Sequence, residues 1–233
     1  MRLIPICVPL LLAAAFLTAG CTGDCSIHAE VDPALNDYIA ARLQEFDDIP
    51  ADRRARLEEI AAFIASKRDA GGLSQLTFIC TQNSRRSLMS QVWARVAADH
   101  FGIARVETFS GGTGSSAFNP RAAAALRRAG LRIEKIGEGD NPIYQVWTRE
   151  DAAPLPAFSK VFDQAPNPQD GFCAVMTCGA ADEACPIVPG AAARVAIPFE
   201  DPKAFDGTER EAEMYDARSR QIAREMLYAF SIL

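Results

Sequence analysis

A cysteine and an arginine stand six positions apart in a polar segment that follows a short apolar run. Cys80 ends that run, and the segment Cys-Thr-Gln-Asn-Ser-Arg-Arg-Ser (residues 80–87) leads into a helix-like stretch. A loop between a strand and a helix can turn successive backbone N–H groups inward and form a nest for an anion. The helix dipole adds positive potential, and the Arg86 guanidinium can hold two oxygens of a tetrahedral oxyanion. The spacing predicts an oxyanion site with Cys80 as its nucleophile.

The same positive field favours the thiolate of Cys80, which is the nucleophilic form of a cysteine. Ser87 can donate its hydroxyl to that thiolate, and Asn83 tolerates the left-handed backbone that a tight loop needs. The predicted binding set comprises Thr81, Gln82, Asn83, Ser84, Arg85 and Arg86. The alternative is that Cys80 only fills space at a strand end, because cysteine is among the most buried residue types.

A second group of cysteines lies in the last third of the chain. Cys178 and Cys185 stand seven positions apart in the segment Thr-Cys-Gly-Ala-Ala-Asp-Glu-Ala-Cys-Pro (residues 177–186). In an exported protein this pair is compatible with a structural disulfide. Buried unpaired thiols are a further interpretation, and it fits Cys173, inside an apolar run, better than the other two. The residues alone leave these alternatives open.

Composition excludes several classes of function. The chain has 233 residues, 49% of them hydrophobic and 23% charged, with a net charge of -6 and a pI near 5.1. An acidic chain of this kind does not favour a nucleic-acid partner. With two histidines, His28 and His100, and no Cys-x-x-Cys spacing, we predict no metal site.

The N-terminus reads as a targeting segment. Arg2 precedes an apolar run over residues 3–16 that is short for a membrane span. Leu-Thr-Ala-Gly-Cys at residues 17–21 resembles a bacterial lipobox, which predicts lipidation at Cys21 and an exported, periplasmic lipoprotein anchored to the membrane. A cleaved, unlipidated secretion signal or a plain anchor is the alternative.

The rest of the chain predicts an α/β fold. Apolar periodicity indicates two helices at residues 33–46 and 51–69, which we interpret as a helical extension. Strands are predicted at residues 76–79, 105–110, 131–136, 172–177 and 195–198, and helices at residues 87–100, 120–129 and 208–230. Residues 143–148 are predicted as an extra strand or hairpin arm, and Asp206 as the cap of the last helix. Alternating strands and helices predict a small three-layer sandwich around a central parallel sheet, with ligands at the carboxyl ends of its strands.

The loop at residues 80–87 resembles the active-site loop Cys-x-x-Asn-x-x-Arg-Ser of the low-molecular-weight protein tyrosine phosphatase superfamily. The resemblance covers about residues 76–230. Ser110-Gly111-Gly112-Thr113 resembles the family's Ser-Ala-Gly-Thr segment, and Asn119-Pro120 an Asn-Pro helix start closer to its thioredoxin-coupled arsenate reductases. Asp201-Pro202 resembles the Asp-Pro loop, whose aspartate implies a general acid. We therefore divide the chain into a leader (1–21), a linker with the helical extension (22–72) and a catalytic domain (73–233).

The segment around Cys178 and Cys185 resembles the redox segment of those arsenate reductases. The resemblance implies that Cys80 attacks arsenate, that Cys178 then attacks Cys80 and releases arsenite, and that Cys185 carries the disulfide outward. It implies no bound cofactor, but an external thioredoxin-like thiol reductant. A relay of this kind requires that the thiols reach one another, since each step is thiolate exchange.

Three features depart from the family pattern. Arg85 stands in the loop where both branches usually have cysteine, and Gln91 stands where the reductases often have a glutamate that helps to hold potassium. The aromatic pair that commonly follows Asp-Pro in tyrosine phosphatases is absent.

The leading hypothesis for the function of this chain is an arsenate reductase. The alternatives are a phosphatase on aryl phosphates, using Cys80, Arg86 and Asp201, and an anchored protein that binds an oxyanion without turnover.

Overall fold

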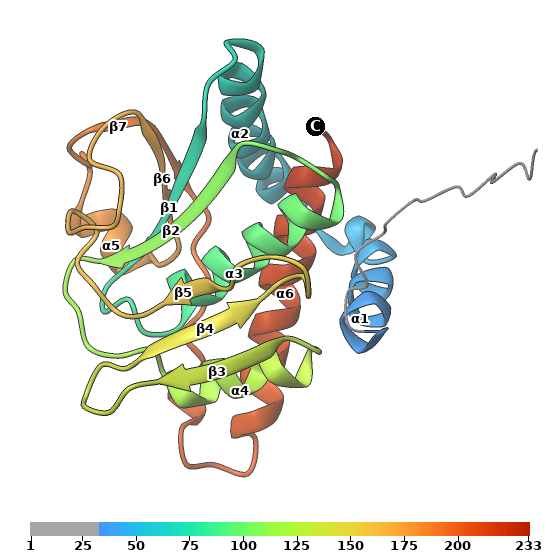
Figure 1. Cartoon of the computed structure of the whole chain (residues 1–233), viewed down its shortest axis with the longest axis vertical. Helices are drawn as coiled ribbons and strands as arrows, with labels where there is room; N and C mark the ends of the chain where they lie inside the picture. Colours follow the sequence, from blue (N-terminus) through green and yellow to red (C-terminus); the bar gives the residue numbers. More distant parts are fainter. Residues whose placement is uncertain (1–32) are drawn as a thin grey trace, which may run out of the picture.

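The computed structural model describes residues 33–233 (Figure 1). Its centre is a four-stranded sheet with the order β2-β1-β6-β7, in which all neighbours are parallel. The strands are β1 (Ser74–Cys80), β2 (Val106–Gly112), β6 (Phe172–Met176) and β7 (Ala191–Ala196). The predicted parallel sheet is confirmed, with β1 at its middle and Cys80 at the carboxyl end of β1.

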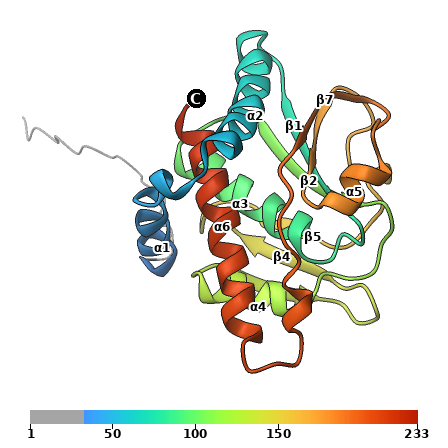
Figure 2. The ribbon, with the colours of Figure 1, turned by 180° about the vertical axis from the view of Figure 1, so that it is seen from behind.

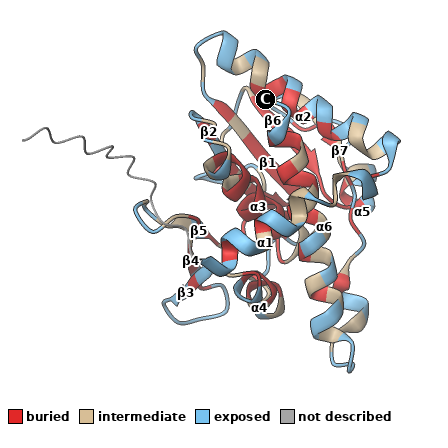
Figure 3. Ribbon diagram, turned by 90° about the vertical axis from the view of Figure 1, so that its right-hand side faces the viewer, coloured by how far each residue is buried: buried red, intermediate tan, exposed pale blue. Residues whose placement is uncertain are grey.

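Two layers cover this sheet, because side chains alternate between its faces. On one face Leu76 and Phe78 of β1 pack in the main core with the helices α2 (Ala51–Asp69), α3 (Arg86–His100) and α6 (Glu211–Ser231). On the other face Ile79 packs in a smaller cluster with the short helix α5 (Gly179–Ala184). Buried residues concentrate in the strands and on the inner faces of these helices (Figure 3). The prediction of a three-layer sandwich is confirmed, and the layer on the α5 side of the sheet is thin.

The predicted strand at residues 131–136 does not join the parallel sheet. It forms β3 (Arg132–Ile136), which pairs antiparallel with β4 (Ile143–Trp147), and β4 pairs with β5 (Leu155–Ala157) in a separate sheet. The sequence of β3 explains the difference, since Ile133 is its single buried residue whereas strands of a parallel sheet are buried on both faces. Because the connection from β3 to β4 is short, these two strands can pair only in the antiparallel direction. The extra strand predicted at residues 143–148 is observed as β4.

The helical extension packs on the rest of the fold. The helix α1 (Pro33–Leu43) lies against α6, and a turn of 3-10 helix, η1 (Phe46–Asp48), leads to α2. α2 lies between α6 and the edge of the sheet that ends in β7 (Figure 2). Leu57, Ile60 and Ile64 of α2 are fully buried in the main core. Among the described helices, none is long and apolar enough to cross a membrane.

The remaining elements lie near the carboxyl ends of the strands. α4 (Pro120–Arg128) follows β2, and its N-cap Asn119 accepts a hydrogen bond from the Arg121 amide, as expected of an Asn-Pro start. A 3-10 helix, η2 (Pro202–Phe205), follows Asp201. The prediction that Asp206 caps the last helix is wrong. α6 begins at Glu211 after Arg210, and the η2 turn instead directs Asp206 inward, toward the loop that follows β1.

Candidate active site

The loop after β1 turns its carbonyl groups outward. The carbonyl oxygens of residues 80, 81 and 84 accept from the amides of residues 113, 114 and 119, and that of residue 82 accepts from Ser116 and Ser159. A trans peptide places its N–H opposite its C=O, so each following amide points to the inside of the loop. In the described part of the chain no backbone carbonyl accepts from the amides of residues 81–85. The loop is therefore an anion nest.

Two residues make this tight loop possible. Asn83 has a positive φ of 42°, the left-handed conformation predicted for it, and its Oδ1 accepts from the Lys160 amide at 2.9 Å. Gly112 at the end of β2 lies so close that a Cβ atom there would be 2.1 Å from the Gly114 carbonyl oxygen and 2.7 Å from the Asn83 nitrogen. The end of β2 can support the loop because residue 112 has no side chain. Sequence reasoning missed Lys160, which comes from a loop far along the chain.

The Cys80 thiol is in hydrogen-bond contact with Ser87. Its Sγ lies 3.0 Å from the Ser87 Oγ at the start of α3, and both side chains are buried. Asn83 Nδ2 donates to the same Oγ at 2.8 Å. Because the Ser87 hydroxyl oxygen already accepts from Asn83, its own hydrogen is free to point at the sulfur. The sulfur thus lies against a hydroxyl group that Asn83 holds in place.

Arg86 and Asp201 lie together at the mouth of the loop. Arg86 Nη2 donates to Asp201 Oδ2 at 2.8 Å, and Arg86 Nη1 donates to the Phe199 carbonyl at 3.0 Å. Arg86 Nε is buried and has no partner among the described residues. Asp201 Oδ1 accepts from the Lys203 amide, which fixes the carboxylate at the start of η2. An oxyanion on the loop amides would give Arg86 the acceptor that its Nε lacks.

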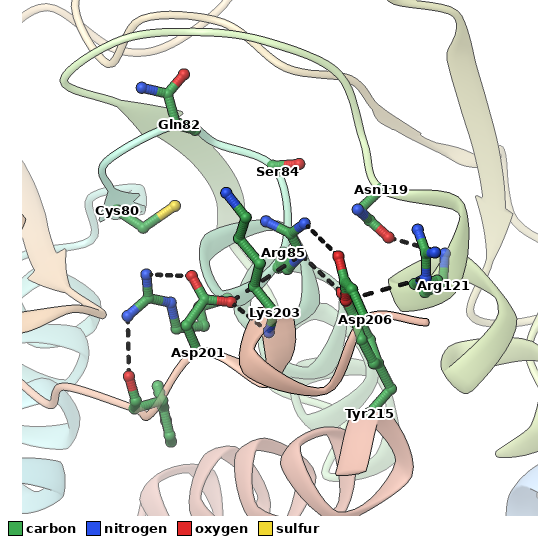
Figure 4. A network of polar contacts seen from close by, with 12 residues as sticks. Cys80, Gln82, Ser84, Arg85, Asn119, Arg121, Asp201, Lys203, Asp206 and Tyr215 are labelled. Carbon is green, nitrogen blue, oxygen red and sulfur yellow. Dashed lines mark hydrogen bonds and ion pairs between the residues drawn. The ribbon is translucent and has the colours of Figure 1, made fainter. Parts of the chain in front are cut away.

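A cavity of about 130 Å³ opens over the Cys80 thiol (Figure 4). Its lining consists of Cys80, Thr81, Gln82, Ser84, Arg85, Arg86, Asp201 and Lys203. Apart from the cysteine these side chains are polar or charged, and the lining contains no aromatic residue. The cavity has the size and polarity for a small oxyanion. Lys203, the residue after Asp201-Pro202, supplies an additional positive charge at the edge of the cavity.

Arg85 lines the edge of the cavity, where its Nε lies 4.0 Å from Asp201 Oδ1, and its guanidinium also reaches Tyr215 and Asp206. Its Nε donates to the Tyr215 hydroxyl at 2.7 Å and its Nη2 to Asp206 Oδ2 at 3.2 Å, and the Tyr215 hydroxyl donates to Asp206 Oδ1 at 2.7 Å (Figure 4). Burial and the hydrogen bond to the Asp206 carboxylate raise the pKa of Tyr215 to about 12. Arg85 thus offers the nest its backbone amide, while its guanidinium ties the loop to α6. Sequence reasoning missed Tyr215, since a tyrosine in a helix carries no signal for this contact.

Cys178 lies beside Cys80 at the end of the neighbouring strand. β1 and β6 pair with Ile79 opposite Met176, and the Thr177 amide continues the ladder by donating to the Ile79 carbonyl. Cys80 and Cys178 thus lie at the carboxyl ends of adjacent strands and belong to one apolar cluster. In the present arrangement the Cys178 Sγ contacts the Thr81 hydroxyl at 3.4 Å.

Cys178 and Cys185 are free thiols at the two ends of α5. Cys178 caps the helix N-terminus, where its Sγ accepts from the Ala181 amide at 3.3 Å. Cys80 and Cys178 belong to one apolar cluster, and the half-buried Cys185 packs against it. Cys173 lies on the opposite face of the sheet in the main core, and burial raises its pKa to about 12. The structure brings three of these four thiols together and separates the fourth.

Gln91, the residue considered for a potassium site, forms hydrogen bonds with other residues of the chain. Gln91 is buried, and its amide donates to the Thr108 carbonyl while its Oε1 accepts from Ser110. Residues 33–233 contain no cluster of histidine, cysteine or acidic side chains suited to a metal ion.

The comparison with known families agrees with this geometry. Residues 75–141 match the family model described as low molecular weight phosphotyrosine protein phosphatase. This part of the chain is similar to that family. The match contains the complete loop at residues 80–87 as well as Gly112 and Asn119, and the resemblance inferred from those residues is confirmed.

Known proteins of two kinds are similar to this chain. An arsenate reductase of Bacillus licheniformis is 29% identical over 155 residues, which cover 66% of this chain and 92% of that protein. A low molecular weight phosphotyrosine phosphatase structure from Vibrio cholerae O395 has a TM-score of 0.43 at 15% identity and covers 68% of this chain and 95% of its own. An arsenate reductase structure from Archaeoglobus fulgidus has a TM-score of 0.40 at 14% identity, covering 65% and 98%.

Proposed function

We propose that this chain is an arsenate reductase in which Cys80 is the nucleophile and Cys178 and Cys185 form a disulfide relay. The observation that supports it most is that Cys80 and Cys178 lie in one apolar cluster at the carboxyl ends of β1 and β6, with Cys185 packed against it. A phosphatase would need neither Cys178 nor Cys185. The similarity to the Bacillus licheniformis arsenate reductase supports the same reaction.

The proposed reaction begins when arsenate binds to the loop amides and Arg86. The Cys80 thiolate attacks arsenic, a sulfur–arsenic bond forms, and an oxygen leaves as water, with Asp201 as the proton donor. The Cys178 thiolate then attacks the sulfur of Cys80. The sulfur–arsenic bond breaks with its electron pair remaining on arsenic, so As(V) becomes As(III) and arsenite leaves. The Cys80–Cys178 disulfide holds the corresponding two-electron oxidation.

Cys185 completes the proposed relay. Its thiolate attacks Cys178, which restores Cys80 as a thiolate and transfers the disulfide to the ends of α5. An external dithiol, such as a thioredoxin-like protein, then reduces the Cys178–Cys185 disulfide. Cys185 is half-buried, whereas Cys80 and Cys178 are buried, so it is the thiol that such a reductant reaches most readily.

Aryl phosphate hydrolysis is the second candidate. It is favoured by Asp201, which the Arg86 ion pair holds at the mouth of the cavity, where a general acid could protonate a leaving oxygen. The cavity lining contains no aromatic side chain to receive an aryl group. For that reason we favour a small inorganic oxyanion over an aryl phosphate.

Two assays on the purified chain from residue 26 onward test the proposal. Arsenate reduction with a thioredoxin system is measured beside aryl phosphate hydrolysis for wild type, Cys178→Ala and Cys173→Ala. Cys173→Ala is the matched control, because Cys173 is equally buried but lies on the other face of the sheet. We expect Cys178→Ala to lose arsenate turnover and keep any hydrolysis. Equal arsenate reduction by wild type and Cys178→Ala would refute the relay.

We also propose that the protein is an exported lipoprotein in the periplasm, with its leader removed at Cys21. That cysteine lies outside the described residues, and the proposal rests on the lipobox-like segment. The mass of the protein extracted from membranes tests it, because acylation adds the mass of the fatty acyl chains to a chain that begins at residue 21. A mature mass without that addition would contradict lipidation. An exported reductase of this type requires a thiol reductant in the same compartment.

A further inference from the structure

We infer that Arg53, in the helical extension, is a positioning residue for the oxyanion site. This inference rests on the proposed oxyanion chemistry, and it applies to arsenate and to phosphate alike. Arg53 lies in α2, which precedes the family match that begins at residue 75. Its guanidinium holds the segment between β7 and η2, and that segment carries both the carbonyl that orients Arg86 and the Asp201 carboxylate. The helical extension thereby contributes to the site.

The topology brings α2 to this segment. α2 leads directly into β1 and runs antiparallel to it, so its first turn lies at the carboxyl ends of the strands. Lys67, near the end of α2, lies close to Gly171 at the start of β6, whereas Arg53 lies close to Ile197 at the end of β7. The helix therefore spans the sheet, with its N-terminus at the edge where the anion nest is built.

Arg53 makes several contacts with the segment after β7. Its Nη1 donates to the Pro198 carbonyl at 2.9 Å, and its Nη2 lies 3.5 Å from the Ile197 carbonyl. The guanidinium also lies over the Phe199 ring, 4.6 Å from the ring centroid. Three consecutive residues of the segment are thus held by one side chain, which restricts where the Phe199 carbonyl can point.

The held segment is directly connected to the anion clamp. The Phe199 carbonyl accepts from Arg86 Nη1 at 3.0 Å, and Asp201, two residues further on, accepts from Arg86 Nη2 at 2.8 Å. These two contacts are what orient the Arg86 guanidinium. A shift of the segment would rotate the fork that must meet two oxygens of the oxyanion. Arg53 thus acts on the site through Phe199 and Arg86 without touching the cavity.

The position of Arg53 in the first turn does not favour the stability of the helix itself. A cation in the first turn opposes the positive end of the helix dipole. Its partner Glu225 is fully buried in α6, where Oε1 accepts from Arg53 Nε at 2.7 Å and from Gln221 at 2.9 Å. A guanidinium can serve the carboxylate and two carbonyls while it lies flat on a ring, whereas a lysine ammonium cannot.

The substitution Arg53→Lys, made in the full chain, tests the inference with inorganic phosphate as the probe. It keeps the charge opposite Glu225 but loses the fork toward Ile197 and Pro198. Arg42→Lys is the matched control. Arg42 also belongs to the extension, pairs with Glu45 at 2.7 Å, and lies 4.5 Å from the Tyr38 ring centroid. Among residues 33–233 the Arg42 side chain bonds to Glu45 and not to residues 197–201, so its substitution measures the loss of a stacked arginine as such.

Calorimetry well below the thermal midpoint of each variant separates positioning from folding. We expect Arg53→Lys to bind phosphate about tenfold more weakly than wild type, as loss of one aligned charged hydrogen bond would cause. We expect Arg42→Lys to stay within twofold. In turnover assays KM should rise more than kcat falls.

Phosphate affinity of Arg53→Lys within twofold of wild type, at any thermal midpoint, would overturn the inference. Equal weakening in both variants would do the same. A wild-type chain that binds no phosphate would overturn the oxyanion site and the inference together. A wild type that binds phosphate but reduces no arsenate would overturn the reductase proposal alone, and the Arg53 inference would stand or fall on the affinities.

Discussion

At the scale of single residues, the site depends on which atom donates each hydrogen bond. Asn83 is held by the Lys160 amide, so its own amide group points at Ser87, and Ser87 in turn points at Cys80. These hydrogen bonds connect the Lys160 amide to the Cys80 sulfur through the side chains of Asn83 and Ser87. A thiolate accepts such a bond better than a thiol does, and a hydrogen bond to a charged group is worth about 1.5–3 kcal/mol.

Ser87→Ala should therefore make Cys80 less reactive as a nucleophile. We expect alkylation of Cys80 by iodoacetamide at pH 7 to slow about tenfold, since the lost bond favours the thiolate. Mass spectrometry of the labelled peptide measures the rate at this cysteine alone. Ser90→Ala is the control, because the Ser90 hydroxyl in the same helix donates to the Arg86 carbonyl instead. Equal slowing in both variants would contradict the assigned role of Ser87.

At the scale of elements, the short helix α5 opposes the last step of the proposed relay. Cys178 and Cys185 flank its six residues, and a helical rise of about 1.5 Å per residue sets their Cα atoms roughly 10 Å apart. A disulfide needs about 4.4–6.8 Å. The helix must therefore unwind when this disulfide forms, and its small size makes the cost low.

Oxidation of the pair should increase amide hydrogen exchange in residues 179–184. In the reduced chain the amides of residues 182 and 185 donate to the carbonyls of residues 178 and 181, and the oxidised chain cannot keep these helical hydrogen bonds. Exchange mass spectrometry of peptides from both forms measures the change, with Cys185→Ala under the same oxidant as control. If the oxidised wild type protects this segment as well as the reduced one, the disulfide does not join Cys178 to Cys185.

A second element-scale feature is the close approach of the end of β2 to the anion loop. Gly112→Ala would put a methyl group against backbone atoms that cannot move aside. We expect it to lower the free energy of unfolding by about 2 kcal/mol or more and to weaken phosphate binding. Gly114→Ala is the control, since a Cβ there would be 3.5 Å from its nearest neighbour, an ordinary contact. Denaturant unfolding of both variants measures the difference, and equal stabilities would contradict the packing argument.

At the scale of the whole molecule, a buried cation with a weak hydrogen-bond partner affects the free energy of unfolding. Lys160 is 4% exposed, and its ammonium makes a 3.4 Å contact with the Phe158 carbonyl and lies over the Phe158 ring. Burial lowers the pKa of Lys160 to about 8. Between pH 8 and about 10.5 the unfolded chain therefore binds more protons at this residue, and its contribution to stability rises with pH.

Lys160→Met should remove this pH dependence. Because the buried charge costs up to about 3 kcal/mol at pH 7, we expect the variant to gain most over wild type at neutral pH and to lose that gain near pH 10. The comparison of variant and wild type at each pH cancels the opposite trend from Cys173 and Tyr215, whose raised pKa values lower stability in alkali. Urea unfolding at several pH values measures it. A constant difference across this range would contradict the buried-charge argument.

Local patterns were enough to predict most elements of this fold. Helix periodicity predicted α2 at residues 51–69, and Asn119-Pro120 predicted the start of α4, because both signals lie in adjacent residues. The strand at residues 131–136 was predicted correctly, but its partner was not. A strand's sequence records burial and length, whereas the choice of partner depends on the connection and the rest of the sheet.

The sequence by itself determined the anion nest, since Cys80, Asn83, Arg86 and Ser87 act through one loop whose spacing is local. Only the tertiary structure decided what surrounds that loop. Lys160 holds Asn83, Tyr215 takes up Arg85, and Cys178 stands beside Cys80, each from a distant part of the chain. Such contacts come from packing layers and strand order, and no local spacing encodes them. The candidate nucleophile can therefore be predicted from the eight residues 80–87, while the choice of reaction depends on the fold.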